Sequence, residues 1–178
     1  MSRGSRSNEQ LLLGEWACLG ILAASPTHGF AISARLKPSG DIGRVWSLSR
    51  PLVYRSLDQL TARGFVVEVS EEPGIAGGAR KILAPTAAGR VRLIGWLAAP
   101  VAHLRDLRSE LLLKLVLAEL CGVDTAGLIK AQRLLVLEHH ERVEDQLAGG
   151  PGLAGDVVMQ WRLESSAAAL RFLGRLGG

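Results

Sequence analysis

A single predicted β-hairpin with a glycine-rich tip, set among helical segments, constrains the fold of this 178-residue chain more than any other feature. Residues 65–69 and 81–83 are short runs of β-forming and apolar side chains, whereas residues 71–80 contain one Pro and three Gly. Elsewhere, apart from the connecting segments, apolar residues recur at helical spacing. We therefore expect a mostly α, α+β fold in which one hairpin packs against helices.

Two helices are predicted before that hairpin, near the start of the chain. Residues 11–24 carry apolar side chains at helical spacing, and Ser25 with Pro26 ends the segment. Thr27 stands where a cap is needed for a short second helix over residues 28–36. The inner face of this second helix is expected to carry Phe30, Ile32 and Leu36.

A third helix is predicted over residues 50–63, between Ser49 at its N-cap and Gly64 after its C-terminus. At about 100° per residue, its side chains fall into two groups. Val53, Leu57 and Leu60 share the face expected to be buried, while Pro51, Tyr54, Arg55 and Asp58 lie around the other. The helix thus combines a packed side with an exposed side that offers a guanidinium and a phenol.

Three helices followed by a hairpin are the order of a winged helix-turn-helix, in which the third helix enters the DNA major groove. Residues 1–95 contain 12 Lys and Arg against 7 Asp and Glu, whereas residues 96–178 contain 9 against 10. Of the 21 cations, 17 are Arg, whose planar fork suits phosphates and guanine edges. The basic front half favours a polyanionic partner, and a merely solvated basic surface is the alternative.

The residues expected to contact DNA lie around the start of the third helix, on its exposed face and on the wing. They are Ser47, Ser49, Arg50, Tyr54, Arg55, Gly77, Gly78, Arg80 and Lys81. The two glycines keep the wing thin, and Arg80 and Lys81 are expected to contact phosphates rather than bases. Burial of Tyr54 against the second helix and a solvated Arg55 are the alternatives, and Trp46 is expected to anchor the core.

The motifs at these positions resemble the PadR-like transcriptional regulators. The resemblance is carried by PTHGF at 26–30, WSLS at 46–49, VYRSLDQL at 53–60 and GGARK at 77–81, and it extends to residues 108–115. It implies a homodimer whose C-terminal helices clasp the partner and whose recognition helices face a pseudo-palindromic operator in double-stranded DNA. The resemblance also implies a repressor, since most members are repressors, and some are released by phenolic or other small apolar ligands.

The chain departs from the family pattern at the wing and at the opening of the third helix. Ile82–Leu83 stands where an aromatic pair is usual, Pro85 replaces a customary Leu, and residues 50–52 are Arg-Pro-Leu. The operator sequence is therefore not carried over. By resemblance, Trp16 and Trp96 face the dimer interior, where they either pack the core or line a ligand pocket for a small apolar effector.

Three parts are expected along the chain: a flexible arm over residues 1–10, a winged helix-turn-helix DNA-binding domain over 11–98, and an all-helical dimerisation domain over 99–178. Thr86 is expected to cap a helix over residues 87–98. The helices predicted in the last part cover residues 107–120, 126–147 and 157–176, and Trp161 is expected to pack the last of them. The mean hydropathy of +0.21 is high for a soluble monomer. This surplus suggests an apolar surface covered by a second copy of the chain.

Enzymatic, cofactor-binding and metal-binding functions lack support in the sequence. Nucleophile, paired-carboxylate and phosphate-loop arrangements are missing, so no catalytic residues, no cofactor and no metal are assigned. His140 and Glu144 lie one helical turn apart, but a third ligand at fixed spacing is lacking. An enzyme is therefore not expected.

A cytoplasmic protein is expected. Cys18 and Cys121 are interpreted as buried thiols in a reducing compartment, and no apolar run reaches the roughly 18 to 20 residues of a membrane span. Glu15, within the first apolar run, argues against a secretory signal there. Two other functions stay open: a winged module that binds protein rather than DNA, and a sensor of the related MarR type. The second is disfavoured because the winged unit begins at residue 11.

Overall fold

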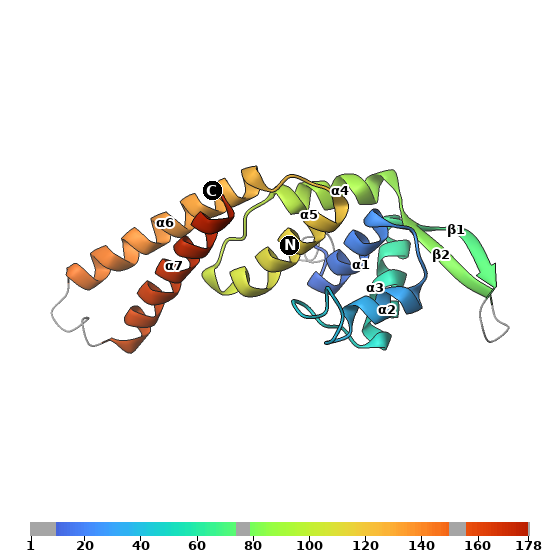
Figure 1. Cartoon of the computed structure of the whole chain (residues 1–178), viewed down its shortest axis with the longest axis horizontal. Coiled ribbons are helices and arrows are strands. Elements are labelled where there is room, and N and C mark those ends of the chain that lie inside the picture. Colours follow the sequence, from blue (N-terminus) through green and yellow to red (C-terminus); the bar gives the residue numbers. More distant parts are fainter. Residues whose placement is uncertain (1–9, 74–78, 150–155, 178) are drawn as a thin grey trace, which may run out of the picture. The chain divides into compact units, whose positions relative to one another are not determined.

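The computed structural model describes residues 10–73, 79–149 and 156–177 of the chain (Figure 1). The chain forms two compact units, one made of residues Met1–Leu97 with Leu112–Val123 and the other of Ala98–Leu111 with Asp124–Gly178. The described residues contain seven α-helices and one two-stranded antiparallel sheet, which is the mostly α, α+β class expected from the sequence. Among the described helices, none combines the length and the apolar character needed to cross a membrane.

The first unit contains a helical cluster, the hairpin and one helix contributed by a later segment of the chain. In order, its elements are α1 (Leu13–Ala24), α2 (Gly29–Leu36), α3 (Arg50–Ala62), β1 (Val66–Pro73), β2 (Ala79–Pro85), α4 (Ala87–Ala98) and α5 (Leu112–Cys121). The second unit contains a 3-10 turn (Leu104–Asp106), a π-helical turn (Leu107–Leu111), α6 (Ala126–Ala148) and α7 (Val157–Leu176).

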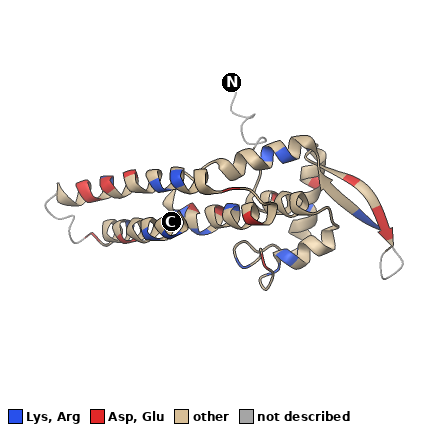
Figure 2. Cartoon of the chain, turned by 45° about the horizontal axis from the view of Figure 1, so that its top comes forward, with Lys and Arg blue, Asp and Glu red and all other residues tan. Residues whose placement is uncertain are grey.

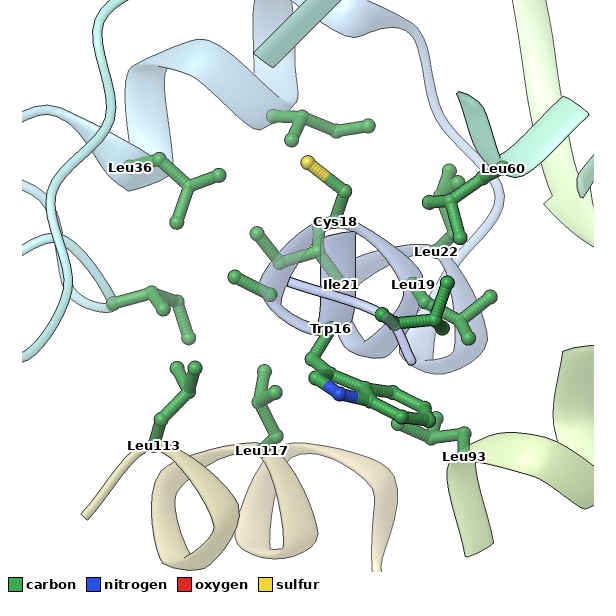
Figure 3. Packing of buried hydrophobic residues seen from close by; sticks show 14 of the residues in the cluster. Trp16, Cys18, Leu19, Ile21, Leu22, Leu36, Leu60, Leu93, Leu113 and Leu117 are labelled. Carbon is green, nitrogen blue, oxygen red and sulfur yellow. The ribbon is translucent and has the colours of Figure 1, made fainter. Parts of the chain in front are cut away.

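Helix α1 is the centre of the first unit and is buried over most of its length. Ala17, Cys18, Leu19 and Leu22 are completely inaccessible to solvent, and α3 and α5 both pack against this helix (Figure 3). A helix that is apolar on all sides gains stability only when several neighbours cover it. Leu117 of α5 fills the space beside Gly20, where an added Cβ would lie 2.7 Å from Leu117 Cδ1.

Helix α5 therefore belongs to the core of the first unit. The sequence placed this segment in a separate C-terminal domain over residues 99–178. Leu113 and Leu117 are both fully buried in the cluster that contains α1 (Figure 3). Sequence spacing cannot assign an apolar helix to one of two cores, because it reports which side is apolar and not which partner covers it.

The start of α2 differs from the expectation in two respects. The N-cap is His28, whose Nδ1 accepts a hydrogen bond from the Ala31 N–H at 3.1 Å, and not Thr27. Thr27 instead forms two backbone hydrogen bonds with Leu83 of β2, so its position is fixed by the hairpin. Phe30 is 53% exposed and does not belong to the inner face, because it lies about 200° around the helix from the buried Ile32.

Helix α3 ends and the hairpin begins at Gly64, whose φ of 72° lies in the left-handed region that favours glycine. Strands β1 and β2 pair from Val66 with Pro85 to Pro73 with Ala79, with an irregularity between Glu68 and Ser70. The strands are longer than predicted, because backbone pairing continues through residues whose side chains are exposed on both faces of the hairpin. The hairpin thus extends away from α1–α3 (Figure 1).

Helix α4 is fixed to the base of the hairpin. Thr86 caps it, as predicted, by accepting from the Gly89 N–H at 3.0 Å, and its hydroxyl donates to the Gly64 carbonyl at 2.7 Å. A Cβ on Gly89 would lie 2.2 Å from the Phe65 carbonyl oxygen. Only glycine allows the helix to approach the backbone this closely.

The second unit is built on the pairing of α6 with α7, which lie side by side (Figure 1). Gln132, which is buried, fixes the preceding segment by accepting from the Val101 N–H at 2.7 Å and donating to the Val101 carbonyl at 3.0 Å. Trp161 is 71% exposed on α7. The prediction that this tryptophan packs the last helix is wrong, because its position on α7 points away from the α6 contact.

Candidate nucleic-acid interface

Helix α3 presents its polar face to solvent, as the sequence predicts. Val53, Leu57 and Leu60 are buried in the core, whereas Arg50, Tyr54, Arg55 and Asp58 are exposed. Tyr54 is 41% exposed and its ring lies against Gly29 of α2, so it is half-buried against that helix while part of its side chain stays accessible. The exposed side of α3 is therefore available for a partner.

A groove of about 860 Å³ lies between the start of α2, the exposed side of α3 and the hairpin. It brings together four of the predicted DNA-contact residues, which are Arg50, Tyr54, Arg80 and Lys81. Its other lining residues are His28, Gly29, Phe30, Leu57, Asp58, Thr61, Ala62, Glu68, Ala79 and Leu83. Sequence reasoning missed His28, Phe30 and Glu68. From the sequence, His28 is only the first residue of the second helix, Phe30 is expected on the inner face of that helix, and Glu68 stands at an unremarkable strand position.

Two aromatic rings hold the guanidinium of Arg50 in this groove. Its Cζ lies 5.4 Å from the centre of the Phe30 ring and 5.7 Å from the centre of the Tyr54 ring. A cation within about 6 Å of an aromatic face is attracted by the ring quadrupole. Phe30 comes from α2 and Tyr54 follows Arg50 by one turn of α3, so two elements orient one side chain.

The hairpin is less basic than the predicted cations suggest. The Lys81 ammonium contacts Glu68 Oε2 at 2.7 Å, and this hydrogen bond, together with the attraction of the two charges, raises the pKa of Lys81. The described strands also contain Glu71 and Glu72, so the acidic residues of the hairpin outnumber Arg80 and Lys81 (Figure 2). Of the two cations, Arg80 is half-buried and Lys81 is exposed.

The remaining predicted contacts lie outside the groove. Arg55 borders a second hollow of about 590 Å³ on the other side of α3, with Leu12, Leu48 and Leu52. Ser47 and Ser49 are exposed before α3, and the Ser49 side chain makes no capping hydrogen bond. Gly77 and Gly78 lie outside the described residues.

Trp16 and Trp96 contact each other directly. Their rings stack with centroids 4.7 Å apart and planes 7° from parallel, and the Lys114 ammonium lies 4.8 Å from the centre of the Trp96 ring. Trp16 and Lys114 are buried, and Trp96 is half-buried. This arrangement corresponds to the core-packing alternative, because the facing ring surfaces leave no room for a ligand between them. Trp46 is half-buried at the core.

The histidine pair of α6 takes part in contacts between helices. His140 Nδ1 lies 2.8 Å from Ser166 Oγ of α7, and its Nε2 lies 3.5 Å from Glu144 Oε1. Burial lowers the pKa of the neighbouring His139, with smaller contributions from Arg142 and Arg162. No group of three or more potential metal ligands occurs in the part of the chain that the structure describes.

Comparison with known proteins identifies the first unit. Residues 18–94 match the model of the Transcriptional regulator PadR-like family. A search of curated proteins found no significant match. The matched region begins inside α1 and ends inside α4, so it contains α2, α3 and the complete hairpin.

Solved structures with similarity to the chain include three bacterial proteins. Bacillus subtilis PadR in complex with operator DNA is 19% identical, with a TM-score of 0.47 over 92% of this chain and 97% of that chain. The Streptococcus mutans protein smu.1604c is 17% identical, with a TM-score of 0.45 over 92% and 98%. The PadR-like transcriptional regulator BC1756 from Bacillus cereus is 18% identical, with a TM-score of 0.42 over 94% and 95%.

The family match and the described elements agree with each other. The match covers the helices and the hairpin that form the groove, and the sequence motifs that resemble the family at 26–30, 46–49 and 53–60 lie within it. The family consists of regulators and not of enzymes. Residues 18–94 are therefore a domain of the PadR-like family of transcriptional regulators.

Proposed function

We propose that this chain is a transcriptional regulator that binds specific double-stranded DNA, with α3 in the major groove and the hairpin along the flanking backbone. The observation that carries the proposal is the groove between α3 and the hairpin, on which Arg50, Tyr54, Arg80 and Lys81 converge. The DNA major groove is about 12 Å wide and admits an α-helix such as the exposed α3. The basic strand beside α3 would then lie along the flanking backbone.

The proposed roles differ between residues. Arg50 and Tyr54 would contact base edges, and the exposed Arg55, which borders the second hollow, would contact bases or phosphates. Ser47 and Ser49 would position the start of α3 against the backbone. Arg80 and Lys81 would contact phosphates, as would Gly77 and Gly78 if the expectation from the sequence holds, because side chains on a wing reach the flanking backbone more readily than the base edges.

Fluorescence anisotropy with a duplex selected from a random pool tests DNA binding. We expect the Arg55→Ala, Arg80→Ala double variant to bind at least tenfold more weakly at about 0.1 M salt, because two cations near phosphates are lost. Arg90→Ala, on the exposed side of α4, is the matched control and should retain most of the affinity. Equal affinity of the double variant and the wild type would assign DNA contact to another face.

The chain is proposed to act as a homodimer through its second unit, as a repressor at paired half-sites about one helical turn apart. Support comes from α6 and α7, which together expose seven large apolar side chains. These are Leu134, Leu135, Leu137, Val157, Val158, Trp161 and Leu176. A reporter gene placed behind the selected operator separates repression from activation.

A small apolar effector is part of the proposal and would act at Trp96. Trp96 is half-buried, with Trp16 stacked on its ring and the Lys114 ammonium over the ring, so an aromatic ligand would contact Trp96 at its edge. Tryptophan fluorescence during titration with simple phenols tests this, with Trp96→Leu as the variant. Quenching that persists in Trp96→Leu would place the ligand elsewhere.

The acidic side of the hairpin favours one alternative, a winged module that binds a protein. Glu68, Glu71 and Glu72 would attract a basic protein surface as readily as Lys81 attracts phosphate. The size of the salt dependence separates the two functions. DNA binding weakens by orders of magnitude between 50 and 200 mM salt when several phosphates are contacted. Exposed ion pairs between two proteins each contribute little, and so their screening should weaken binding to a basic protein surface far less.

A further inference from the structure

We propose that Arg50 recognises a guanine in each half-site, and that Phe30 and Tyr54 act as positioning residues that preset its guanidinium for this contact. The inference rests on the proposed DNA binding and names the base that the groove would read. It starts from an arginine at the first position of α3, which is exposed and makes no ion pair in the described part of the chain.

The surroundings of Arg50 restrict its movement. Its Cζ lies 5.4 Å from the centre of the Phe30 ring and 5.7 Å from that of Tyr54. The Tyr54 ring is itself supported from α2, where a Cβ on Gly29 would lie 3.0 Å from Tyr54 Cε1. An arginine side chain that is already ordered loses less rotamer entropy on binding than a free one.

The charge pattern of the groove favours a base edge over a run of phosphates. Besides the cations Arg50, Arg80 and Lys81, the groove is lined by the carboxylates of Asp58 and Glu68, and Glu68 pairs with Lys81. A polyanionic backbone lying in the groove would meet both carboxylates. A base-pair edge offers donors as well as acceptors, and so it is compatible with a groove of mixed charge.

Guanine is the base whose major-groove edge matches a guanidinium. Its N7 and O6 are two adjacent acceptors, and the parallel N–H groups of arginine donate to both at once. Adenine presents an acceptor next to a donor, which repels one arm of the fork. An oriented Arg50 therefore discriminates between the two purines.

Selection of binding sites from a random duplex pool, carried out with the full chain, tests the inference. For the wild type we expect one invariant guanine in each half-site, and its replacement by adenine should weaken binding roughly ten- to hundredfold. Arg50→Gln should shift the preference at that position from guanine to adenine, because a glutamine amide matches the adenine edge. Arg90→Gln removes the same charge outside the groove and should leave the selected sequence unchanged.

A second variant tests the positioning role of the ring. Phe30→Leu keeps an apolar side chain at an exposed position, and so the fold should remain intact. We expect the ratio of affinities for guanine and adenine sites to fall about two- to fivefold, the contribution of an exposed cation–π contact, while binding to unrelated duplex DNA stays the same. An unchanged ratio in Phe30→Leu would refute the positioning role.

The outcomes separate this inference from the proposed function. If the wild type selects a defined site but Arg50→Gln selects the same site, the guanine assignment is wrong and the regulator function stands. If the wild type binds duplex DNA without selecting any sequence, or does not bind it, both are overturned. Circular dichroism of each variant confirms that the readout reports recognition and not folding.

Discussion

At the scale of single residues, the surroundings of a cation decide what it can contribute to binding. Arg50 lies over two rings that carry no net charge, and so its full charge remains available to a partner. Lys81 shares its charge with Glu68 at 2.7 Å. Two residues that look equivalent in sequence therefore differ in the free charge they present.

The ion pair of the hairpin leads to a prediction for Glu68→Gln. The substitution frees the Lys81 ammonium and removes a carboxylate from the groove, so DNA binding should tighten several-fold at low salt. The slope of log affinity against log salt should steepen by about 0.9, the value of one additional phosphate contact. Anisotropy between 50 and 200 mM salt measures both. Glu119→Gln on α5 is the charge-matched control, and an unchanged slope in Glu68→Gln would mean that Lys81 does not reach a phosphate.

Burial of Cys18 makes stability depend on alkaline pH. Removal from water, with a smaller contribution from Glu15, raises the pKa of the Cys18 thiol from 9.0 to about 12. The unfolded chain therefore loses this proton first, and the stability contributed by the neutral thiol is complete below pH 9 and is lost between pH 9 and about 12.

Urea unfolding at a series of alkaline pH values tests this dependence. The free energy of unfolding of the wild type should decline above pH 9, and Cys18→Ala should decline less steeply because the titrating group is absent. Cys121→Ala is the comparison, since burial also raises the pKa of that half-buried thiol, but to a smaller extent. Parallel curves for the wild type and Cys18→Ala would show that the thiol does not control the decline.

At the scale of elements, the sequence predicted those helices whose signals are local. The bounds of α4 and the last helix, 157–176, follow from Thr86 and from the apolar spacing, and both agree with the structure. The predictions for single residues were wrong where the residue contacts an element that is distant in the sequence. Thr27 bonds to β2 and not to its own helix, and Phe30 turns toward Arg50 and not toward the core.

The site shows the same division between local and distant signals. The exposed face of α3 could be predicted because helical spacing fixes which side chains share a face. The pairing of Lys81 with Glu68 could not, because it depends on the register of β1 against β2, and that register shifts between Glu68 and Ser70. A one-residue change of register moves a side chain to the opposite face of a hairpin.

The contact between α4 and the base of the hairpin predicts opposite effects for two glycines of one helix. Gly89→Ala should destabilise the chain by about 1–3 kcal/mol, because the new Cβ would meet the Phe65 carbonyl oxygen and α4 must shift. Gly95→Ala meets no atom within 4 Å and should stabilise the helix by about 0.5–1 kcal/mol. Urea unfolding of both variants gives the comparison, and equal stabilities would contradict the close approach at Gly89.

At the scale of the whole molecule, the two units have different surfaces. The first unit presents the charged groove together with exposed apolar side chains such as Leu12 and Val91, whereas the exposed large apolar side chains of the second unit lie on α6 and α7. Surface of this kind is costly in water unless a partner covers it. In the proposed dimer, the partner chain would cover the exposed apolar side chains of the second unit. The two chains would then present two copies of the groove to one DNA duplex.

Substitution of the apolar surface should therefore separate assembly from folding. We expect the Leu134→Glu, Trp161→Glu double variant to remain helical, because both side chains are more than half exposed, while its mass by light scattering falls from that of a dimer toward that of a monomer. Affinity for a duplex that contains two half-sites should fall at least tenfold. In a dimer, binding of one chain holds the other chain close to the second half-site, whereas two monomers must bind the two half-sites independently. A wild-type chain that is monomeric at micromolar concentration would contradict the proposed dimer.

The position of α5 has a consequence for any attempt to isolate the regulatory domain. The chain crosses between the two units three times, after residues 97, 111 and 123, so the first unit is not contiguous in sequence. A fragment that stops at residue 98 would lack Leu113 and Leu117 and leave one side of α1 facing water. We therefore expect a fragment confined to the family domain to be less stable than the complete first unit, and an isolated version of this domain would need helix α5 to cover α1.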